Sequence, residues 1–325
     1  MDFELSDDEV ALAEGMRRLC QGRFPLERLR TAEGAPVVVD RAGWAELADA
    51  GVFGLCQPES EGGSGLPSAA AAVVFEELGR ALVPGPLLAS HLAAGIVDGA
   101  TGGKAVVGAV HTRGAGRAAP VVVEHLGSLH SLVVVDDDGL AVLDPSSLAA
   151  VAVQRALDPL TPLWRVERLP AGERVAGPDA AARWRRDAQV MGGALLVGLA
   201  AATLELAVGY AKVREQFGKP IGSFQAVKHM CADMLVRVEV ARAAVHAAAV
   251  TVDQPDVGDQ WRAAAGAAVL ASEAAVANGK TCIQVHGGMG FTWEVPAHLY
   301  LMRARMLAAA LEGTGSLAET VAERY

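Results

Sequence analysis

The order of local sequence patterns along the chain constrains its fold more than any single motif. The first hundred residues have helical patterns, and the first helix starts at a capping box, S-x-x-E, over residues 6–9. Short β-branched runs separated by turn residues follow Gly102-Gly103, and Asp137-Asp138-Gly139 predicts a hairpin between two of them. The helical pattern returns near Pro178, where we predict helices over 179–213, 223–252, 258–284 and 295–311.

This order lacks the alternation of strand and helix that builds a parallel sheet, so it disfavours a dinucleotide-binding Rossmann domain. The run "GAG" at 114–116 is also too short and wrongly placed for that fold's glycine fingerprint. We therefore predict a mainly α protein with a small β domain. Its predicted parts are an N-terminal α-helical domain over 1–102, a β domain over 103–175 and a C-terminal four-helix bundle over 176–325.

Charge and cysteine content argue against several classes of function. With 325 residues, 52% of them apolar, the chain can bury a large core and divide into two or three domains. Its net charge of −10 argues against nucleic acid or an anionic membrane surface as the main partner. The four cysteines are far apart, which predicts neither a metal site nor a disulfide framework. The acidic start of the sequence does not resemble a signal peptide, so we expect a cytoplasmic protein.

The apolar stretch "VMGGALLVGLAAATLELAVGY" at 190–210 is long enough to span a bilayer. It contains Glu205, four glycines and many alanines, and no aromatic belt flanks it. A helix buried inside a helical bundle explains this composition better than a membrane span does. We therefore expect no membrane partner.

The stretch "REQFGKPIGSFQAVKHM" at 214–230 is the first candidate binding site. Its glycines and proline at 218–222 stop helix propagation, and Ser223 is the predicted N-cap of the next helix. Arg214 then lies on a connection beside a helix N-terminus. There a guanidinium and free backbone N–H groups suit a phosphate or pyrophosphate.

Three neighbours of Arg214 would extend such a site. Gln216 lies on the same connection, Phe217 would pack against a flat ring, and Gln225 would reach a ligand from the first turn of the helix. The alternative is a tight turn between two helices with a solvated arginine. From residue chemistry alone, that alternative explains the stretch better.

The run "QVHGGMGFTWE" at 284–294 is the second candidate. Three glycines in four positions follow an apolar helical segment. They favour a helix C-cap with positive φ and a close approach of the backbone to another body. Gln284 and His286 would flank that approach, next to Gly287 and Gly288. An ordinary C-cap with a hydrogen-bonded histidine explains the run better when it is taken alone.

Glu312 is the candidate catalytic residue. It follows a predicted helix rich in leucine, methionine and alanine. A carboxylate in apolar surroundings has a raised pKa and can act as a base. A solvated glutamate at a helix end is the commoner situation, and the residues leave both readings open.

Together, in this order and spacing, these segments resemble the C-terminal domain of the acyl-CoA dehydrogenase family. The stretches "GWAELADAGVFGLCQPESEGGSGL" and "FEELGRAL" are similar to that family's first helical domain. The resemblance is specific over about 180–310, fair over 1–90 and poor in the middle. It implies an N-terminal α domain, a middle β domain and a C-terminal four-helix bundle, in agreement with the patterns above.

The resemblance implies α,β-dehydrogenation of an acyl-CoA thioester, in which a glutamate removes the α-proton and FAD accepts the β-hydride. It also implies an electron-transfer flavoprotein or a similar acceptor. In this family the ADP contacts usually serve the FAD of a neighbouring subunit, so an oligomer is expected. Carried over, these contacts are Arg214 at the pyrophosphate, Gln216, Phe217 and Gln225 along the ADP portion, and Gln284, Gly287 and Gly288 at the adenine end.

The middle of the chain departs from the family pattern. The β domain is shorter than usual. Neither the Glu-Pro…Gly-Ser-Asp stretch nor the Trp-Ile-Thr/Ser stretch, which normally flank the flavin ring, occurs between 103 and 172. The chain therefore offers only half of an FAD site.

The position of the base also departs from the pattern. The family has two known positions for the catalytic glutamate. The first, counted back from Arg214, falls at Ala188 and Gln189, and neither residue has a carboxylate. The other is a Glu-Gly-Thr motif, which Glu312-Gly313-Thr314 matches by letter. A gapless count from the glycine run lands on Leu311 instead, and one residue turns a helical side chain by about 100°.

These departures resemble the short subunits of heteromeric α2β2 acyl-CoA dehydrogenases of actinobacterial steroid catabolism, in which a full-length subunit carries the base and most flavin-ring contacts. The leading prediction is a subunit that completes the FAD site with such a partner chain. A self-sufficient homo-oligomer with Glu312 as base is the first alternative. A non-catalytic scaffold without FAD is the second.

Overall fold

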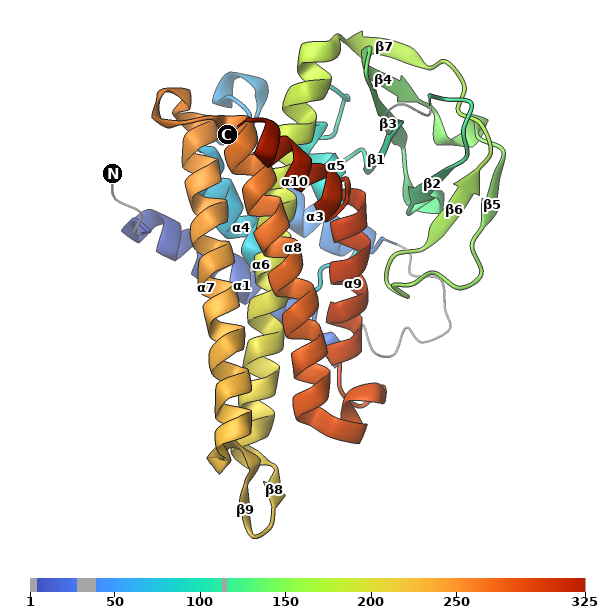
Figure 1. Cartoon of the computed structure of the whole chain (residues 1–325). Coiled ribbons are helices and arrows are strands. Elements are labelled where there is room, and N and C mark those ends of the chain that lie inside the picture. The colour runs from blue at the N-terminus through green and yellow to red at the C-terminus, as the bar shows by residue number, and fades with distance from the viewer. Residues whose placement is uncertain (1–4, 28–38, 113–115, 325) are drawn as a thin grey trace. The chain divides into compact units, whose positions relative to one another are not determined.

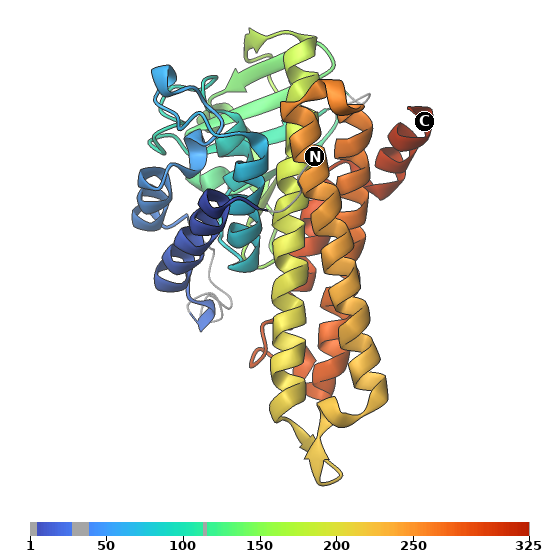
Figure 2. The same ribbon diagram turned by 90° about the vertical axis from the view of Figure 1, so that its left-hand side faces the viewer.

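The computed structural model describes residues 5–27, 39–112 and 116–324 (Figure 1, Figure 2). The chain divides into two compact units. The first consists of Met1–Thr31, Ser68–Val83 and Gln189–Tyr325, and the second of Ala32–Pro67 and Pro84–Ala188. Most of the described residues are helical and a smaller part forms sheet, which confirms the predicted fold class. The predicted domain limits near 102 and 175 stay predictions.

Long helices form the first unit, and α6, α7, α8 and α9 lie side by side in both views (Figure 1, Figure 2). Each of these four agrees within two residues at either end with a helix predicted from the sequence. The helices are α1 Asp7–Arg23, α4 Ser68–Arg80, α6 Pro178–Val213, α7 Gln225–Asp253, α8 Gln260–His286, α9 Ala297–Ala310 and α10 Gly313–Glu323. The first residues of α6, up to Ala188, are assigned to the second unit. Short elements of this unit are β8 Glu215–Gln216, β9 Lys219–Pro220, η5 Ile221–Ser223, η6 Pro255–Val257 and η7 Gly287–Phe291.

Side-chain caps explain where two of these helices begin. At α1 the predicted capping box is present, because the Glu9 amide donates to Ser6 Oγ and the Ser6 amide donates to Glu9 Oε2. Asp259 caps α8 by accepting from two backbone amides of its first turn. The prediction for α7 was wrong: its N-cap is Phe224, and Ser223 belongs to the preceding turn η5. The first amides of α7 therefore have no side-chain cap.

Helices α4 and α6 cross with their backbones in contact. A Cβ atom added to Gly198 of α6 would lie 1.9 Å from the Glu76 carbonyl oxygen. One added to Gly79 of α4 would lie 2.1 Å from the Leu195 carbonyl oxygen. Only glycine fits at both positions, so the two residues fix how closely these helices approach.

A buried amide sets the register of three bundle helices. Asn278 of α8 is fully buried, and its Nδ2 donates to the backbone oxygens of Ala200 on α6 and Met234 on α7. Arg237 donates to its Oδ1 at 3.4 Å. Since a buried polar group is costly without partners, a shift of any one helix would break this arrangement.

Helix α6 is long and apolar enough to cross a membrane by length and composition alone. However, 78% of its most apolar window is buried inside the protein. This burial fits the expected helix at the centre of a bundle.

The second unit holds the β structure and short helices. Strands β1, β3, β4 and β7 form one sheet in that order, and β2, β6 and β5 form another. The predicted hairpin is present, because β3 and β4 pair antiparallel and Asp136 lies opposite Gly139. The elements are α3 Arg41–Asp49, η1 Val52–Gly54, η2 Glu59–Glu61, α5 Leu87–Leu92, β1 Val107–His111, β2 Val121–Glu124, η3 Leu126–Ser128, β3 Ser131–Asp136, β4 Gly139–Leu143, η4 Pro145–Ser147, β5 Ala150–Ala152, β6 Leu163–Val166 and β7 Glu173–Ala176.

The segment 85–100 is less helical than its composition predicts. Only α5, six residues long, forms there. Gly95 and Gly99 have φ values of 74° and 78°, in the left-handed region that ends a right-handed helix. The glycines therefore outweigh the alanine and leucine content of the segment.

A cluster of ion pairs lies at the end of strand β3 in the first sheet. Asp136, at the end of β3, accepts from Arg117 and Arg174, each at 2.7 Å. Burial alone would raise the pKa of Asp136, but these hydrogen bonds and charges lower it to about 2. The carboxylate is thus stabilised in its charged form.

Candidate functional site

The connection between α6 and α7 is a two-residue hairpin. Strands β8 and β9 pair antiparallel, with Gln216 opposite Lys219. Phe217 and Gly218 form the turn with φ values of 54° and 76°, the positive pair of a type I′ turn. Positive φ disfavours a bulky residue such as phenylalanine. The Phe217 ring is nevertheless 91% exposed, and it contacts its own chain through an edge-to-face arrangement with the Phe224 ring, at 6.1 Å between centroids.

Arg214 lies at the base of this hairpin, directly after α6 ends. Its backbone oxygen accepts from the Ile221 amide at 2.7 Å, which closes the hairpin just before α7. The Arg214 side chain is exposed, as are Gln216 and Gln225. Residues 212–230 contain three lysines and one arginine against one glutamate, in a chain of net charge −10. The α6–α7 connection is therefore a local basic surface at the uncapped N-terminus of a 29-residue helix.

The second candidate segment lies at the same end of the bundle. Helix α8 ends at Gly287, which has φ 58° as the sequence predicted for a C-cap glycine. Gln284, Gly287 and Gly288 are exposed. The rings of Tyr210 on α6 and His286 on α8 stack at 4.3 Å, which joins the two helix ends. Figure 1 shows β8–β9 and the end of α8 at this end of the bundle.

This bundle end, formed by residues 212–230 and 284–291, fits an anionic ligand with flat rings. It offers an exposed guanidinium, exposed amide side chains, uncapped backbone amides and an exposed aromatic ring. These groups suit a pyrophosphate and an attached ring system. The seven predicted cofactor-binding residues are thus brought to one end of the bundle and are all accessible there.

Glu312 lies at the other end of α9. It is the left-handed residue, with φ 77°, between α9 and α10. Helix α9 has 14 residues, so about 21 Å of helix separates it from the bundle end described above. The preceding Leu311 is buried and lies where a Cβ on Gly192 of α6 would touch it. The structure therefore does not bring Glu312 together with Arg214.

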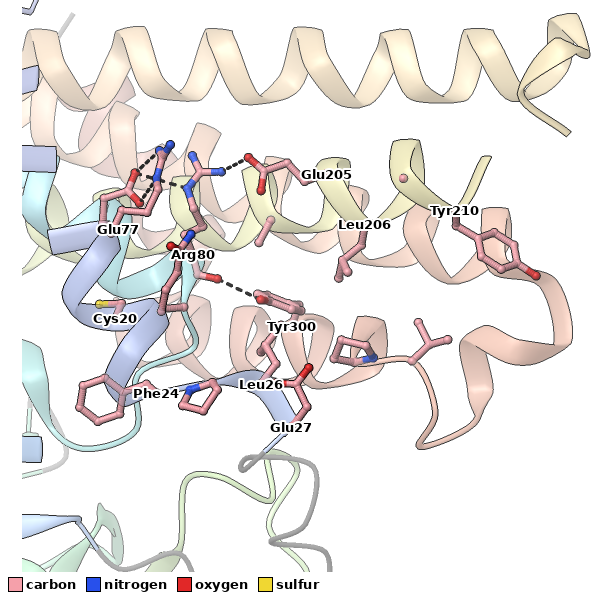
Figure 3. Close-up of a pocket in the computed structure, with 18 of the residues that line it drawn as sticks. Cys20, Phe24, Leu26, Glu27, Glu77, Arg80, Glu205, Leu206, Tyr210 and Tyr300 are labelled. Atoms are coloured by element: carbon pink, nitrogen blue, oxygen red, sulfur yellow. Dashed lines mark hydrogen bonds and ion pairs between the residues drawn. The ribbon is translucent and has the colours of Figure 1, made fainter. Parts of the chain in front are cut away.

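The sequence did not reveal a cavity of about 720 Å³ in the first unit (Figure 3). It is lined by residues from α1, α4, α6, the end of α8 and the segment leading into α9. His286 is one of them, but none of the eight predicted site residues is. Because the lining comes from segments far apart in the sequence, no local motif could have indicated it.

Paired charges form one wall of this cavity. Arg17 donates to both oxygens of Glu77, at 2.8 and 2.7 Å. Figure 3 shows Arg80 between Glu77 and Glu205, and the Tyr300 hydroxyl donates to the Arg80 backbone oxygen at 2.9 Å. Both arginines are thus engaged by carboxylates of the chain itself.

Glu76, the neighbour of Glu77 on α4, connects these ion pairs to α7. Arg80 and Arg242 donate to its carboxylate, with the nearest Arg242 contact at 2.8 Å. Burial alone would raise the pKa of Glu76, but these two arginines hold it below its usual value. The network therefore joins α1, α4, α6 and α7 through charges that the chain satisfies internally.

Comparison with known proteins agrees with this fold. The profile "Acyl-CoA dehydrogenase, N-terminal domain" matches residues 6–101, and "Acyl-CoA dehydrogenase, C-terminal domain" matches residues 186–325. These matches cover more than half of the chain. The chain belongs to the acyl-CoA dehydrogenase family, a family of oxidoreductases acting on CH–CH bonds.

Two relatives are similar over most of the chain. Acyl-CoA dehydrogenase IpdE2 of Mycolicibacterium smegmatis is 32% identical over 320 residues, which cover 94% of this chain and 95% of that protein. Acyl-CoA dehydrogenase FadE34 of Mycobacterium tuberculosis is 40% identical over 295 residues, which cover 84% of this chain. The chain spans only 40% of the length of FadE34.

Two solved structures share the fold at 24% sequence identity. One is the ChsE4–ChsE5 complex from Mycobacterium tuberculosis, with a TM-score of 0.84, covering 99% of this chain and 98% of the matched chain. The other is a variant of the steroid ACAD Tcur3481–Tcur3483, also at 0.84, covering 98% and 97%.

Proposed function

We propose that this chain is a subunit of an FAD-dependent acyl-CoA dehydrogenase and completes an FAD site together with a partner chain. The proposed reaction is the α,β-dehydrogenation of an acyl-CoA thioester. A steroid-derived acyl group is the first substrate class to test, because one structural neighbour is described as a steroid ACAD. The proposed setting is the cytoplasm, with an electron-transfer flavoprotein or a similar protein as acceptor.

The exposed basic bundle end carries this proposal. Arg214, Phe217 and Gln284 are exposed there, although Phe217 also contacts the Phe224 ring of its own chain. If a ligand or partner covers the Phe217 ring, its burial would compensate for the strained backbone and the 91% exposure of this residue. A structural neighbour that is a complex of two different chains supports a heteromer as the assembled form.

In the proposed site, each residue of this chain binds or orients the cofactor. Bound FAD would supply the acceptor for the hydride that leaves the substrate's β-carbon. The Arg214 guanidinium would hold the pyrophosphate, together with the first amides of α7. Gln216, Phe217 and Gln225 would line the ADP portion.

The second segment would close the adenine end. Gln284 would donate or accept a hydrogen bond through its exposed amide, and the exposed backbone of Gly287 and Gly288 leaves room for close approach. No Cβ contact within 4 Å blocks either glycine.

The partner is proposed to supply the catalytic base. A base must come within hydrogen-bond reach of the α-proton that it removes. The gapless count from the glycine run places Leu311, which has no acid–base group, at the family position of the base. Glu312 lies one residue farther along the chain, in the left-handed turn between α9 and α10.

Co-expression tests the proposal directly. The chain would be purified alone and with a full-length acyl-CoA dehydrogenase chain, and the visible flavin absorbance and the oligomeric mass would be measured. We expect a colourless single chain and a yellow complex that bleaches when an acyl-CoA is added. A single chain that is yellow and bleaches would instead support a self-sufficient homo-oligomer with Glu312 as base. A complex without flavin would leave only the scaffold function, and the absence of any complex would contradict the proposal.

A further inference from the structure

We propose that the cavity of the first unit binds a small apolar molecule that carries a cationic amine, at a site that none of the seven proposed FAD residues lines. Its volume of about 720 Å³ lies within the roughly 300–1,000 Å³ typical of small-molecule sites. Such sites combine apolar walls with a few polar groups that fix orientation.

Apolar side chains from three segments form much of the wall. Phe24 and Leu26 come from the end of α1 and the residues after it, Leu206 from α6, and Val295 and Pro296 from the segment before α9. Figure 3 shows the labelled side chains of this group around the cavity. An apolar body several carbons wide would bury surface against these side chains on entering.

The charged lining groups favour a cation. The lining contains two arginines and four glutamates. Arg17 and Arg80 are paired with Glu77 and Glu205, so no lining arginine is left over for an anion. The remaining carboxylates, Glu27 and Glu294, are exposed at the cavity and would attract a positive group.

His286 adds a hydrogen-bond acceptor to the lining of the cavity. It is only 6% exposed, and its Nδ1 lies 2.8 Å from the Cys282 backbone oxygen. A carbonyl oxygen only accepts, so Nδ1 carries the proton and Nε2 of the neutral ring is an acceptor. Among the described residues no hydrogen bond to Nε2 is formed, and the residue lines the cavity. An ammonium group would donate to this nitrogen.

The aromatic rings of the lining also favour a cation. Tyr210 and Tyr300 both line the cavity, and a tyrosine ring face attracts a cation. The Tyr300 hydroxyl already donates its proton to Arg80, so only its lone pairs are left for a ligand. The two arginines and four glutamates of the lining sum to a formal charge of −2, which disfavours the anionic FAD and CoA groups here.

Three probes with the same apolar body separate charge from size. Isothermal titration calorimetry would compare 4-phenylbutylamine, 4-phenylbutanol and 4-phenylbutyrate on the assembled protein. We expect the amine to bind most tightly, the alcohol more weakly and the carboxylate least. Equal binding of all three, or tightest binding of the carboxylate, would overturn the assignment to a cation.

Two variants locate the binding. Gly209 lines the cavity, and a Cβ added to it would meet no atom within 4 Å, so Gly209→Leu can fill the space without a backbone clash. We expect it to abolish amine binding, while Gly15→Leu, another glycine with no such contact, leaves binding unchanged. The combined Glu27→Gln and Glu294→Gln variant should weaken the amine about three- to tenfold and leave the alcohol unchanged.

Two outcomes would contradict the site itself. Amine binding that survives Gly209→Leu with unchanged affinity would place the ligand elsewhere. An identical loss of amine and alcohol binding in the glutamine variant would show that its carboxylates do not recognise charge. Flavin content, measured by absorbance in each variant, is expected to stay constant because no proposed FAD residue lines the cavity.

Discussion

Two regions of the first unit differ in how their polar and aromatic groups are accommodated. One is the crossing of α4 and α6, and the other is the exposed bundle end at residues 212–230. At the crossing, backbone meets backbone and buried charges have partners within the chain. At the bundle end, Arg214 and Phe217 are exposed, and the turn holds a phenylalanine in a conformation that disfavours it. The first region is explained by the folded chain alone, whereas for the second we propose a bound cofactor or partner.

This difference separates stability from assembly. Variants at the crossing should lower the free energy of unfolding of the isolated chain. Variants at the bundle end should leave that free energy nearly unchanged and alter the retention of FAD or of a partner.

The largest effect is expected for Gly198→Val. Its Cβ would lie 1.9 Å from the Glu76 oxygen and 2.6 Å from the Arg80 amide, so α4 and α6 must separate. We expect a loss of about 3 kcal/mol or more in the free energy of unfolding, measured by urea denaturation. Gly209→Ala on the same helix is the control, because its Cβ meets nothing within 4 Å and alanine favours the helix. Equal stability of the two variants would contradict the close crossing.

Arg214→Ala should have the next largest effect, and on cofactor retention alone. Loss of a charge-assisted hydrogen bond costs about 1.5–3 kcal/mol, which weakens FAD binding by at least about tenfold. Flavin released from the co-expressed complex on dilution would measure it. Arg183→Ala, an exposed arginine near the other end of α6, is the matched control. Unchanged retention in Arg214→Ala would remove this residue from the site.

Asp136→Asn tests an internally satisfied group in the second unit. The folded-state pKa of Asp136, about 2, is below its unfolded value, so its contribution is fully present above about pH 4. It is lost as the pH falls toward 2. We expect the variant to be about 1–2 kcal/mol less stable at pH 7, less than the full linkage value because the arginines are partly exposed. The difference should shrink below pH 4, and a difference independent of pH would contradict the ion-pair account.

Phe217→Asn should change the stability of the isolated chain and the stability of the complex in opposite directions. Asparagine suits the first position of a type I′ turn, so the isolated chain should gain stability, by less than about 1 kcal/mol. Loss of the exposed ring should nevertheless weaken the complex, as measured by its dissociation in gel filtration. Gly218→Ala makes the opposite change, since it keeps the ring and strains the turn at φ 76°. A complex as stable as the original with Phe217→Asn would show that the ring has no partner.

Glu312→Gln is expected to have no effect on the rate of the assembled enzyme, because the proposed base belongs to the partner. Acyl-CoA-dependent flavin bleaching in the complex would measure the rate. Glu319→Gln, an exposed carboxylate on α10, serves as the reference. Abolished bleaching with FAD still bound would assign the base to Glu312 and contradict the proposal that the partner supplies it.

Local patterns predicted the helices of the bundle well because their signals are local. The capping box at Ser6, the glycine at 287 and the long apolar periodicities each depend on neighbours within a few residues. The N-cap of α7 was wrong because the turn η5 takes up Ser223. The glycines at 95 and 99 broke a helix that alanine and leucine content favoured.

The candidate site was predictable where its residues follow one another along the chain. Arg214, Gln216 and Phe217 lie on one connection, so their common place could be expected. That residues 284–288 lie at the same end depends on α6 and α8 packing through Tyr210 and His286, which only the fold shows. The cavity could not be expected at all, because its lining residues lie as far apart along the chain as Arg17 and Tyr300.

The turn at Phe217 and Gly218 has a consequence for the choice of partner. Two paired residues on each strand and two in the loop leave almost no slack, so the reach of the tip from α6 is fixed by covalent geometry. A longer loop could adapt to several surfaces, whereas this short hairpin holds its tip at one distance from the end of α6. In the proposed heteromer, a partner chain whose surface lies slightly nearer to the turn or farther from it would therefore bind less well, whatever its side chains.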